Sequence, residues 1–165
     1  MATTLVSLEE YLNTTFDPDC EFVDGVIVER NVGERPHSFI QTELTFFFRS
    51  MGRKGVFPYV EQRVQVKATR FRIPDLCVYV GEDPTTRIFR TPPFLVVEVL
   101  SRDDRSSDLQ DKIRDYLEFG VRYIWVIDPE KRRAYIYTGD HYYEATGTLW
   151  TKDPDFEFPL DQLFQ

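Results

Sequence analysis

The sequence predicts an α/β domain with a mixed central sheet, and three observations support this prediction. Apolar residues recur at helical spacing in two segments, 36–51 and 106–119. Two almost wholly apolar runs, 94–100 and 122–128, are typical of strands covered on both faces. Because the second helix lies between these runs, we expect a parallel strand pair with a right-handed connection. The length of 165 residues suits one domain, spanning 1–165.

The first part of the chain predicts a short helix, a hairpin and a longer helix. Ser7-Leu-Glu-Glu10 fits a capping box that opens the short helix. Asp24-Gly25 supplies a tight turn inside the segment 21–28, which predicts a β-hairpin. Pro36 begins the longer helix, which we expect to run to about Met51, before Gly52.

The remainder of the chain predicts further strands around the second helix. The segment 56–80 alternates apolar and polar residues and ends in a strand that Pro74-Asp75 begins. Gly120 is expected to end the second helix. The segment 133–138 is expected to pair with the strand before it across a short turn. The tail 156–164 is apolar enough to dock back on the domain.

Composition excludes several classes of protein. Hydrophobic residues make up 42% of the chain, too many for a disordered protein, and no apolar run is as long as a membrane helix. Met1–Val6 lacks the pattern of a secretion signal. Cys20 and Cys77 are too few for a disulfide framework and are expected to be buried thiols. We therefore expect a cytoplasmic protein.

The net charge of −8 limits the ways in which this chain could bind a polyanion. A protein that holds nucleic acid over a wide surface is usually basic. The dense basic spots are short, at Arg102-Asp-Asp-Arg105 and Lys131-Arg-Arg133. A metal-dependent nuclease remains compatible with this charge, because carboxylates that bind cations also make a chain acidic.

Two carboxylates are candidates for a metal site. Glu98 lies in the middle of the most apolar strand, where a lone charge is costly unless it is paired or bound to metal. Its alternative roles are a structural ion pair, or a position near the strand end that reaches water. Asp75 begins a neighbouring strand, and its alternative role is that of a turn residue. Two acids at the same edge of neighbouring strands can share a divalent cation.

Lys112 is the third candidate. At about 100° per residue it lies about 60° from Leu109, on the rim of the apolar stripe of its helix. It either extends along the core and sends its amine to solvent, or faces the carboxylates of the preceding strand.

Four other residues carry weaker signals. Glu43 lies on the rim of the first long helix, where a surface ion pair is the simpler explanation, and Glu21 lies in the hairpin. His37 opens a helix and could contact an anion there. His141 is the only other histidine, and no zinc spacing is present. The sequence also has no P-loop, dinucleotide fingerprint or serine elbow.

Several motifs together resemble the Uma-two type of restriction endonucleases, a branch of the PD-(D/E)XK nuclease superfamily. The motifs are Pro74-Asp75, Glu98-Val-Leu-Ser101, Lys112 and the run from Gly120 to Pro129. The hairpin at Glu21, the helix start at His37 and the apolar ending also fit, so the likeness spans about 8–164. The resemblance implies a restriction-endonuclease-like, three-layer α/β/α domain.

The resemblance also implies a site and a cofactor. Asp75 and Glu98, with the backbone carbonyl of Val99, would hold Mg²⁺, for which Mn²⁺ can substitute. The superfamily usually has its lysine two residues after the second acid, where this chain has Leu100. The resemblance implies that Lys112 on the following helix takes this place. It also suggests Glu21 as a further acid near the ion.

Three functions are compatible with these residues. The first is a Mg²⁺-dependent endonuclease that acts on nucleic acid, with DNA expected, and works as a homodimer because one small domain cuts one strand at a time. The second is a binding or scaffold protein that keeps the nuclease fold without its activity, which Leu100 and the acidic charge favour. The third is a hydrolase for small phosphate esters, which shares the metal site but requires a closed pocket.

Overall fold

The computed structural model describes residues 5–31, 33–51 and 54–165. Two expectations fall partly outside this range. The expectation that Met1–Val6 is not a secretion signal depends partly on residues 1–4. The residue expected to follow the end of the first long helix, Gly52, also lies outside the described residues. Within the described residues, no helix is both long and apolar enough to cross a membrane.

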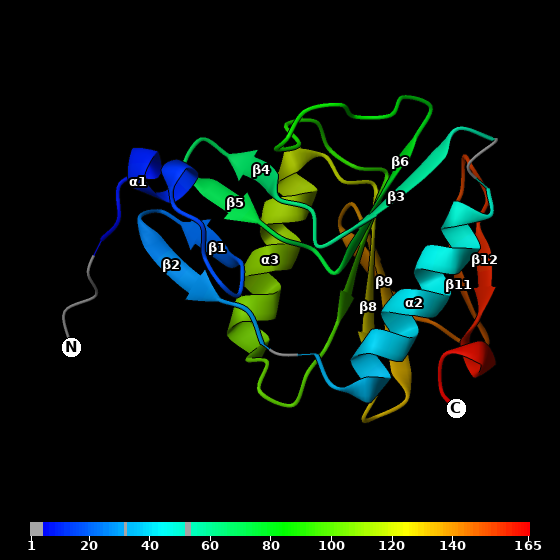
Figure 1. Cartoon of the computed structure of the whole chain (residues 1–165). Coiled ribbons are helices and arrows are strands. Elements are labelled where there is room, and N and C mark those ends of the chain that lie inside the picture. Colours follow the sequence, from blue (N-terminus) through cyan, green and yellow to red (C-terminus); the bar gives the residue numbers. More distant parts are fainter. Residues whose placement is uncertain (1–4, 32, 52–53) are drawn as a thin grey trace.

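A four-stranded antiparallel sheet, here called the small sheet, lies near the N-terminus (Figure 1). Its strand order is β2-β1-β5-β4, with the bounds β1 Cys20–Val23, β2 Val26–Glu29, β4 Val64–Lys67 and β5 Arg70–Arg72. Asp24 and Gly25, at φ 49° and 92°, form the predicted turn between β1 and β2. Helix α1 (Leu8–Asn13) packs on this sheet through Tyr11, and the Ser7 side chain caps the helix as predicted.

A six-stranded mixed sheet, here called the central sheet, forms the middle of the molecule. Its order is β10-β9-β8-β7-β6-β3, with the bounds β3 Val56–Val60, β6 Leu76–Val80, β7 Leu95–Val99, β8 Tyr123–Asp128, β9 Arg133–Thr138 and β10 His141–Glu144. Strands β7 and β8 are parallel, which confirms the prediction from their apolar runs, and the other neighbouring strands are antiparallel.

Two helices cover opposite faces of the central sheet and give the predicted three layers (Figure 1). Helix α2 (Arg35–Arg49) packs on the face that carries Val97 and Val99. Helix α3 (Ser106–Phe119) packs on the face that carries Val96. Since side chains alternate along a strand, Glu98 belongs to the α3 face, and this register places its carboxylate under the helix.

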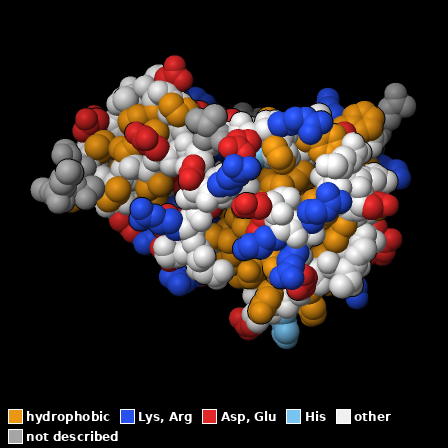
Figure 2. All heavy atoms as spheres, turned by 90° about the horizontal axis from the view of Figure 1, so that it is seen from below, with side chains coloured by type: hydrophobic (Ala, Val, Ile, Leu, Met, Phe, Trp, Pro, Cys, Tyr) orange, Lys and Arg blue, Asp and Glu red, His pale blue; other side chains and the backbone are white. Residues whose placement is uncertain are grey.

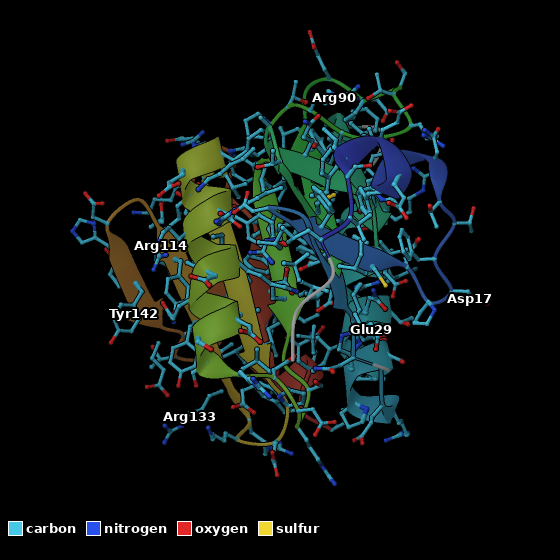
Figure 3. The ribbon with its side chains drawn as sticks, turned by 90° about the vertical axis from the view of Figure 1, so that its left-hand side faces the viewer. Asp17, Glu29, Arg90, Arg114, Arg133 and Tyr142 are labelled. Carbon is cyan, nitrogen blue, oxygen red and sulfur yellow. The ribbon has the colours of Figure 1, made fainter. Side chains whose placement is uncertain are left out.

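Helix α3 also contacts the small sheet on its other side, so it lies between two sheets (Figure 1). In Figure 3 the strand that ends at Glu29 and the edge strand that carries Tyr142 flank α3 on opposite sides. The apolar stripe of α3 faces the central sheet, while its polar Asp115 is fully buried against the small sheet. Gly120, at φ 110°, ends the helix in the left-handed conformation that was predicted.

The C-terminal tail docks back on the domain, as predicted, and the structure places it on the α2 side. It contains β12 (Glu157–Pro159), which pairs with β11 (Thr148–Trp150), and the short helix η2 (Leu160–Gln162). Phe156, Phe158 and Leu163 are buried in the core between α2 and the central sheet.

Candidate metal and phosphate site

A narrow cleft of about 100 Å³ opens where the small sheet meets the end of β7 and the start of α3. Asp75, Glu98, Val99 and Lys112 all line it, so the structure brings together the residues that the sequence singled out. Glu21 and His37 line the same cleft. Glu43 is half-buried on α2 away from the cleft lining, and His141 lies on the exposed edge strand β10.

Asp75 lies immediately before β6 and is 6% exposed. Its Oδ2 accepts a hydrogen bond of 2.7 Å from the backbone N–H of Val99, which joins the start of β6 to the end of β7. Its Oδ1 lies 3.2 Å from both a guanidinium nitrogen of Arg30 and Nε2 of His37. Burial opposes ionisation of Asp75, but the His37 hydrogen bond and the other donors outweigh it and hold the pKa below its ordinary value.

Glu98 is 5% exposed and lies next to the last residue of β7. The Tyr116 hydroxyl donates a 2.6 Å hydrogen bond to its Oε1, and the Lys112 ammonium lies 3.4 Å from its Oε2. Burial is the main cause that raises the pKa of Glu98 to about 7, because Lys112 offsets it only partly and Asp75 and Glu21 add to it. At neutral pH the neighbouring Lys112 and Tyr116 therefore do not fully offset the cost of burying the ionised carboxylate of Glu98.

Lys112 extends from α3 into the cleft rather than to solvent. Its Nζ lies 3.3 Å from Oε1 of Glu21 and 3.4 Å from Oε2 of Glu98. Burial disfavours the ammonium, but Glu98 and then Glu21 outweigh it and raise the pKa of Lys112 above its usual value. Lys112 is therefore a cation held between two carboxylates.

Four residues of the site and its support were missed at the sequence level: Arg30, Arg72, Asp115 and Tyr116. Arg30 follows β2 and Arg72 ends β5, both on short elements whose position depends on the small sheet. Tyr116 lies on the apolar stripe of α3, so its pattern predicts a core residue and gives no sign of the Glu98 contact. Arg72 lies between the apolar residues Phe71 and Ile73, so the alternation predicts a polar residue facing solvent and gives no sign that Arg72 is buried.

No group of three or more His, Cys, Asp and Glu side chains in the described ranges is arranged to hold a metal ion. Asp75, Glu98 and the backbone carbonyl of Val99 could hold an ion at the edge of the central sheet, and the same cleft is also lined by the carboxylates of Glu21, Glu29, Asp103, Asp104 and Asp108. Mg²⁺ is commonly held by one or two carboxylates and keeps several water ligands. The donor set therefore fits Mg²⁺ better than an ion that requires an all-protein cage.

The outer surface around the cleft is mixed in charge. Figure 2, which views the molecule from below Figure 1, shows acidic and basic side chains interspersed with apolar ones on this face. A second cavity of about 260 Å³ adjoins the cleft and shares His37, Ser101, Asp104 and Arg105 with it. Pro36, Leu100, Leu109 and Pro129 give this second cavity an apolar part.

The raised pKa of Glu98 leads to a prediction about stability in the absence of metal. Between pH 4.5 and about 7 the Glu98 carboxyl is mostly ionised in the unfolded chain but mostly protonated in the folded protein. Because the folded protein binds the extra proton, Glu98 lowers the free energy of unfolding as pH rises through this range. We expect Glu98→Gln to be more stable than wild type at pH 8, by roughly 1–3 kcal/mol, with a smaller difference at pH 5. Thermal unfolding in EDTA at both pH values measures this; a difference that grows toward pH 5 would contradict it.

A mixed central sheet with a helix layer on each face is the architecture expected for a restriction-endonuclease-like fold. The chain belongs to the Uma2 family, described as "Putative restriction endonuclease", whose sequence profile matches residues 8–160. This confirms the resemblance identified from the motifs and places the chain among nucleases.

The comparison with solved structures supports the fold. The crystal structure of "a putative nuclease belonging to DUF820" from Anabaena variabilis matches with a TM-score of 0.83 and 21% sequence identity. The match covers 96% of this chain and 97% of that chain. No curated protein matches the chain.

Proposed function

We propose that this protein is a Mg²⁺-dependent endonuclease that hydrolyses phosphodiester bonds in DNA. The observation that carries the proposal is the meeting of two buried carboxylates, Asp75 and Glu98, with the ammonium of Lys112 in one cleft. Membership of the Uma2 family supports the nuclease class.

Asp75, Glu98 and the carbonyl of Val99 would hold the ion. Glu98 is a suitable ligand because its neighbours only partly offset the cost of burying its negative charge, and a divalent cation would supply the missing positive charge. Bound there, Mg²⁺ would polarise the phosphate and make its bound water easier to deprotonate.

Lys112 would act on the phosphate or on the attacking water. An ammonium has three donors, and in the described part of the chain Lys112 pairs with two carboxylates, Glu21 and Glu98. The third donor can reach a group in the cleft. A cation placed there offsets the charge that develops on the phosphate oxygens.

A homodimer belongs to this proposal, because one site cuts one strand of a duplex at a time. The acidic net charge of −8 opposes binding over a wide surface, so we expect contact with DNA to be local to the cleft and its rim. Arg102 and Arg105 lie on that rim and line the cavity beside the cleft.

A second candidate function is a nuclease-fold binding or scaffold protein without activity. The contacts of Asp75 favour it, since Arg30 and His37 both occupy the oxygen that a metal would need. Calorimetric titration with Mn²⁺ separates the two functions. The nuclease should show a site that Glu98→Ala removes, and the scaffold should show none.

Lys112→Ala should lower kcat for plasmid nicking by about 100- to 1000-fold, because it removes a cation from the reacting phosphate. It should not weaken Mn²⁺ binding, since it removes a positive charge from beside the two acids. Nicking rates and a Mn²⁺ titration of the same preparation measure both effects. An active variant, or one that has lost its metal, would contradict the role given to Lys112.

A further inference from the structure

Lys112 is held from two sides by carboxylates that belong to different sheets. Glu98 comes from β7 of the central sheet, whereas Glu21 comes from β1 of the small sheet. The two distances to the ammonium are nearly equal, 3.4 Å and 3.3 Å. Since a lysine side chain is long and flexible, two anchors restrict its position far more than one.

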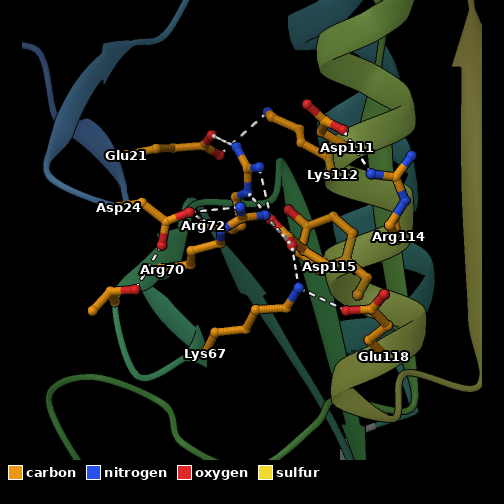
Figure 4. A network of polar contacts seen from close by, with 12 residues as sticks. Glu21, Asp24, Lys67, Arg70, Arg72, Asp111, Lys112, Arg114, Asp115 and Glu118 are labelled. Carbon is orange, nitrogen blue, oxygen red and sulfur yellow. Dashed lines mark hydrogen bonds and ion pairs between the residues drawn. The ribbon is translucent and has the colours of Figure 1, made fainter.

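The Glu21 carboxylate is already occupied by donors from the small sheet and its surroundings (Figure 4). Oε1 accepts a 3.0 Å hydrogen bond from the backbone N–H of Ile73, besides its contact with Lys112. Oε2 accepts a 3.0 Å bond from the Arg72 guanidinium. A carboxylate has about four lone-pair sites, and three are used here. Two cations within 3.3 Å also repel a divalent metal.

Arg72 is fixed in turn by Asp115 of α3. Its Nε and a terminal nitrogen donate bonds of 2.9 Å and 2.7 Å to Oδ2 of Asp115. The Arg72 side chain is 6% exposed and that of Asp115 is fully buried. Arg30 and His37, the donors to Asp75, are more exposed, at 16% and 13%, and within the described ranges neither pairs with a second buried carboxylate, since the other partner of Arg30 is the exposed Glu61. Metal can therefore displace them from Asp75 more easily than it can displace Arg72 from Glu21.

We infer that Glu21 is a positioning residue that anchors Lys112, not a metal ligand, and that Arg72 and Asp115 hold Glu21 in place. The part that Glu21 plays in catalysis rests on the proposed function. When Glu98 faces the metal, Glu21 keeps the ammonium beside the reacting phosphate. The small sheet thus contributes the second side of the catalytic cleft.

Metal binding and kinetics test this inference together. Glu21→Gln should leave Mn²⁺ affinity within about tenfold of wild type, whereas Glu98→Gln should lower it by more than about 100-fold. Glu21→Gln should also lower kcat by about 10- to 100-fold with KM for DNA little changed, because Lys112 is misplaced while the substrate still binds. Glu21→Asp, which keeps the charge but withdraws it by one methylene, should show the same loss of kcat.

Asp24→Asn is the matched control. It makes the same carboxylate-to-amide change in the same hairpin, but its side chain contacts Thr69 and Arg70 and lies outside the cleft. We expect it to keep the kcat of wild type. An equal loss of Mn²⁺ affinity in Glu21→Gln and Glu98→Gln would make Glu21 a metal ligand and overturn the inference. An unchanged kcat in both Glu21 variants would overturn it as well.

A double-mutant cycle tests the anchor independently of catalysis. Thermal unfolding in EDTA of Glu21→Gln, Lys112→Met and the double variant should give non-additive shifts in Tm, because the two side chains interact. Additive shifts would overturn the anchor. If the wild type fails to cut DNA while the shifts are non-additive, the proposed function fails and the contact between Glu21 and Lys112 still stands.

Discussion

Asp75→Ala and Glu98→Ala should each abolish metal-dependent cutting while the fold persists. Each variant removes one of the two carboxylates that line the cleft, so the remaining acid cannot hold the ion in a defined position. The rate of nicking of supercoiled plasmid, in Mg²⁺ or Mn²⁺ and in EDTA, measures the effect. The wild type should nick only with metal.

Two further variants make this result specific. Asp75→Asn keeps an oxygen that can accept the Val99 hydrogen bond, so its loss of activity would not be due to a broken link between β6 and β7. Asp111→Ala removes an exposed acid of α3 that pairs with Arg114 and lies outside the cleft lining, so it should keep full activity. Equal nicking by wild type, Asp75→Ala and Glu98→Ala would show that the assignment is wrong.

Asp115→Ala should destabilise the protein by about 3–5 kcal/mol, the largest effect on stability that we expect. Asp115 is fully buried, and its Oδ1 and Oδ2 pair with Arg70 and Arg72 at 2.8 Å and 2.7 Å (Figure 4). Without it, Arg72 remains buried with one carboxylate fewer. The free energy of unfolding in urea, measured for wild type and variant at pH 7, gives the difference.

Glu118→Ala is the control for this prediction. Glu118 lies on the same helix and pairs with Lys67 at 2.6 Å, but its side chain is 53% exposed. A solvent-exposed pair contributes about 0–1 kcal/mol. If Asp115→Ala costs no more than Glu118→Ala, the buried network does not stabilise the packing of α3 on the small sheet.

The sequence predicted best those helices and strands in which apolar residues recur with a clear period or in an unbroken run. Helix α3 and strand β9 have the predicted bounds, because the first has a clear apolar stripe with a glycine stop and the second follows a tight turn. The pairing of β7 with β8 followed from two apolar runs joined by a helix. Lys112 was found on the rim of the α3 stripe, which is the part of a helix that lies next to the covered strand.

The small sheet explains most of what the sequence could not predict. It covers the polar side of α3, so Asp115 is buried although its position lies off the apolar stripe. Its strands were predicted from the hairpin at 21–28 and the alternation in 56–80, but the partners of Glu21 come from β5 and α3, far away in the chain. Strand β10 was missed because its sequence, His-Tyr-Tyr-Glu, does not alternate apolar and polar residues, and all four residues are exposed in the structure.

The most direct test of the account is the position of Mn²⁺ in crystals of the wild-type protein. Anomalous scattering should locate an ion in contact with the carboxylates of both Asp75 and Glu98, with metal–oxygen distances of about 2.1 Å. We expect Arg30 or His37 to have moved away from Asp75, and Lys112 to remain against Glu21. Crystals soaked in Mn²⁺ that show no ion in this cleft, with Asp75 still paired to Arg30 and His37, would contradict the proposed metal site.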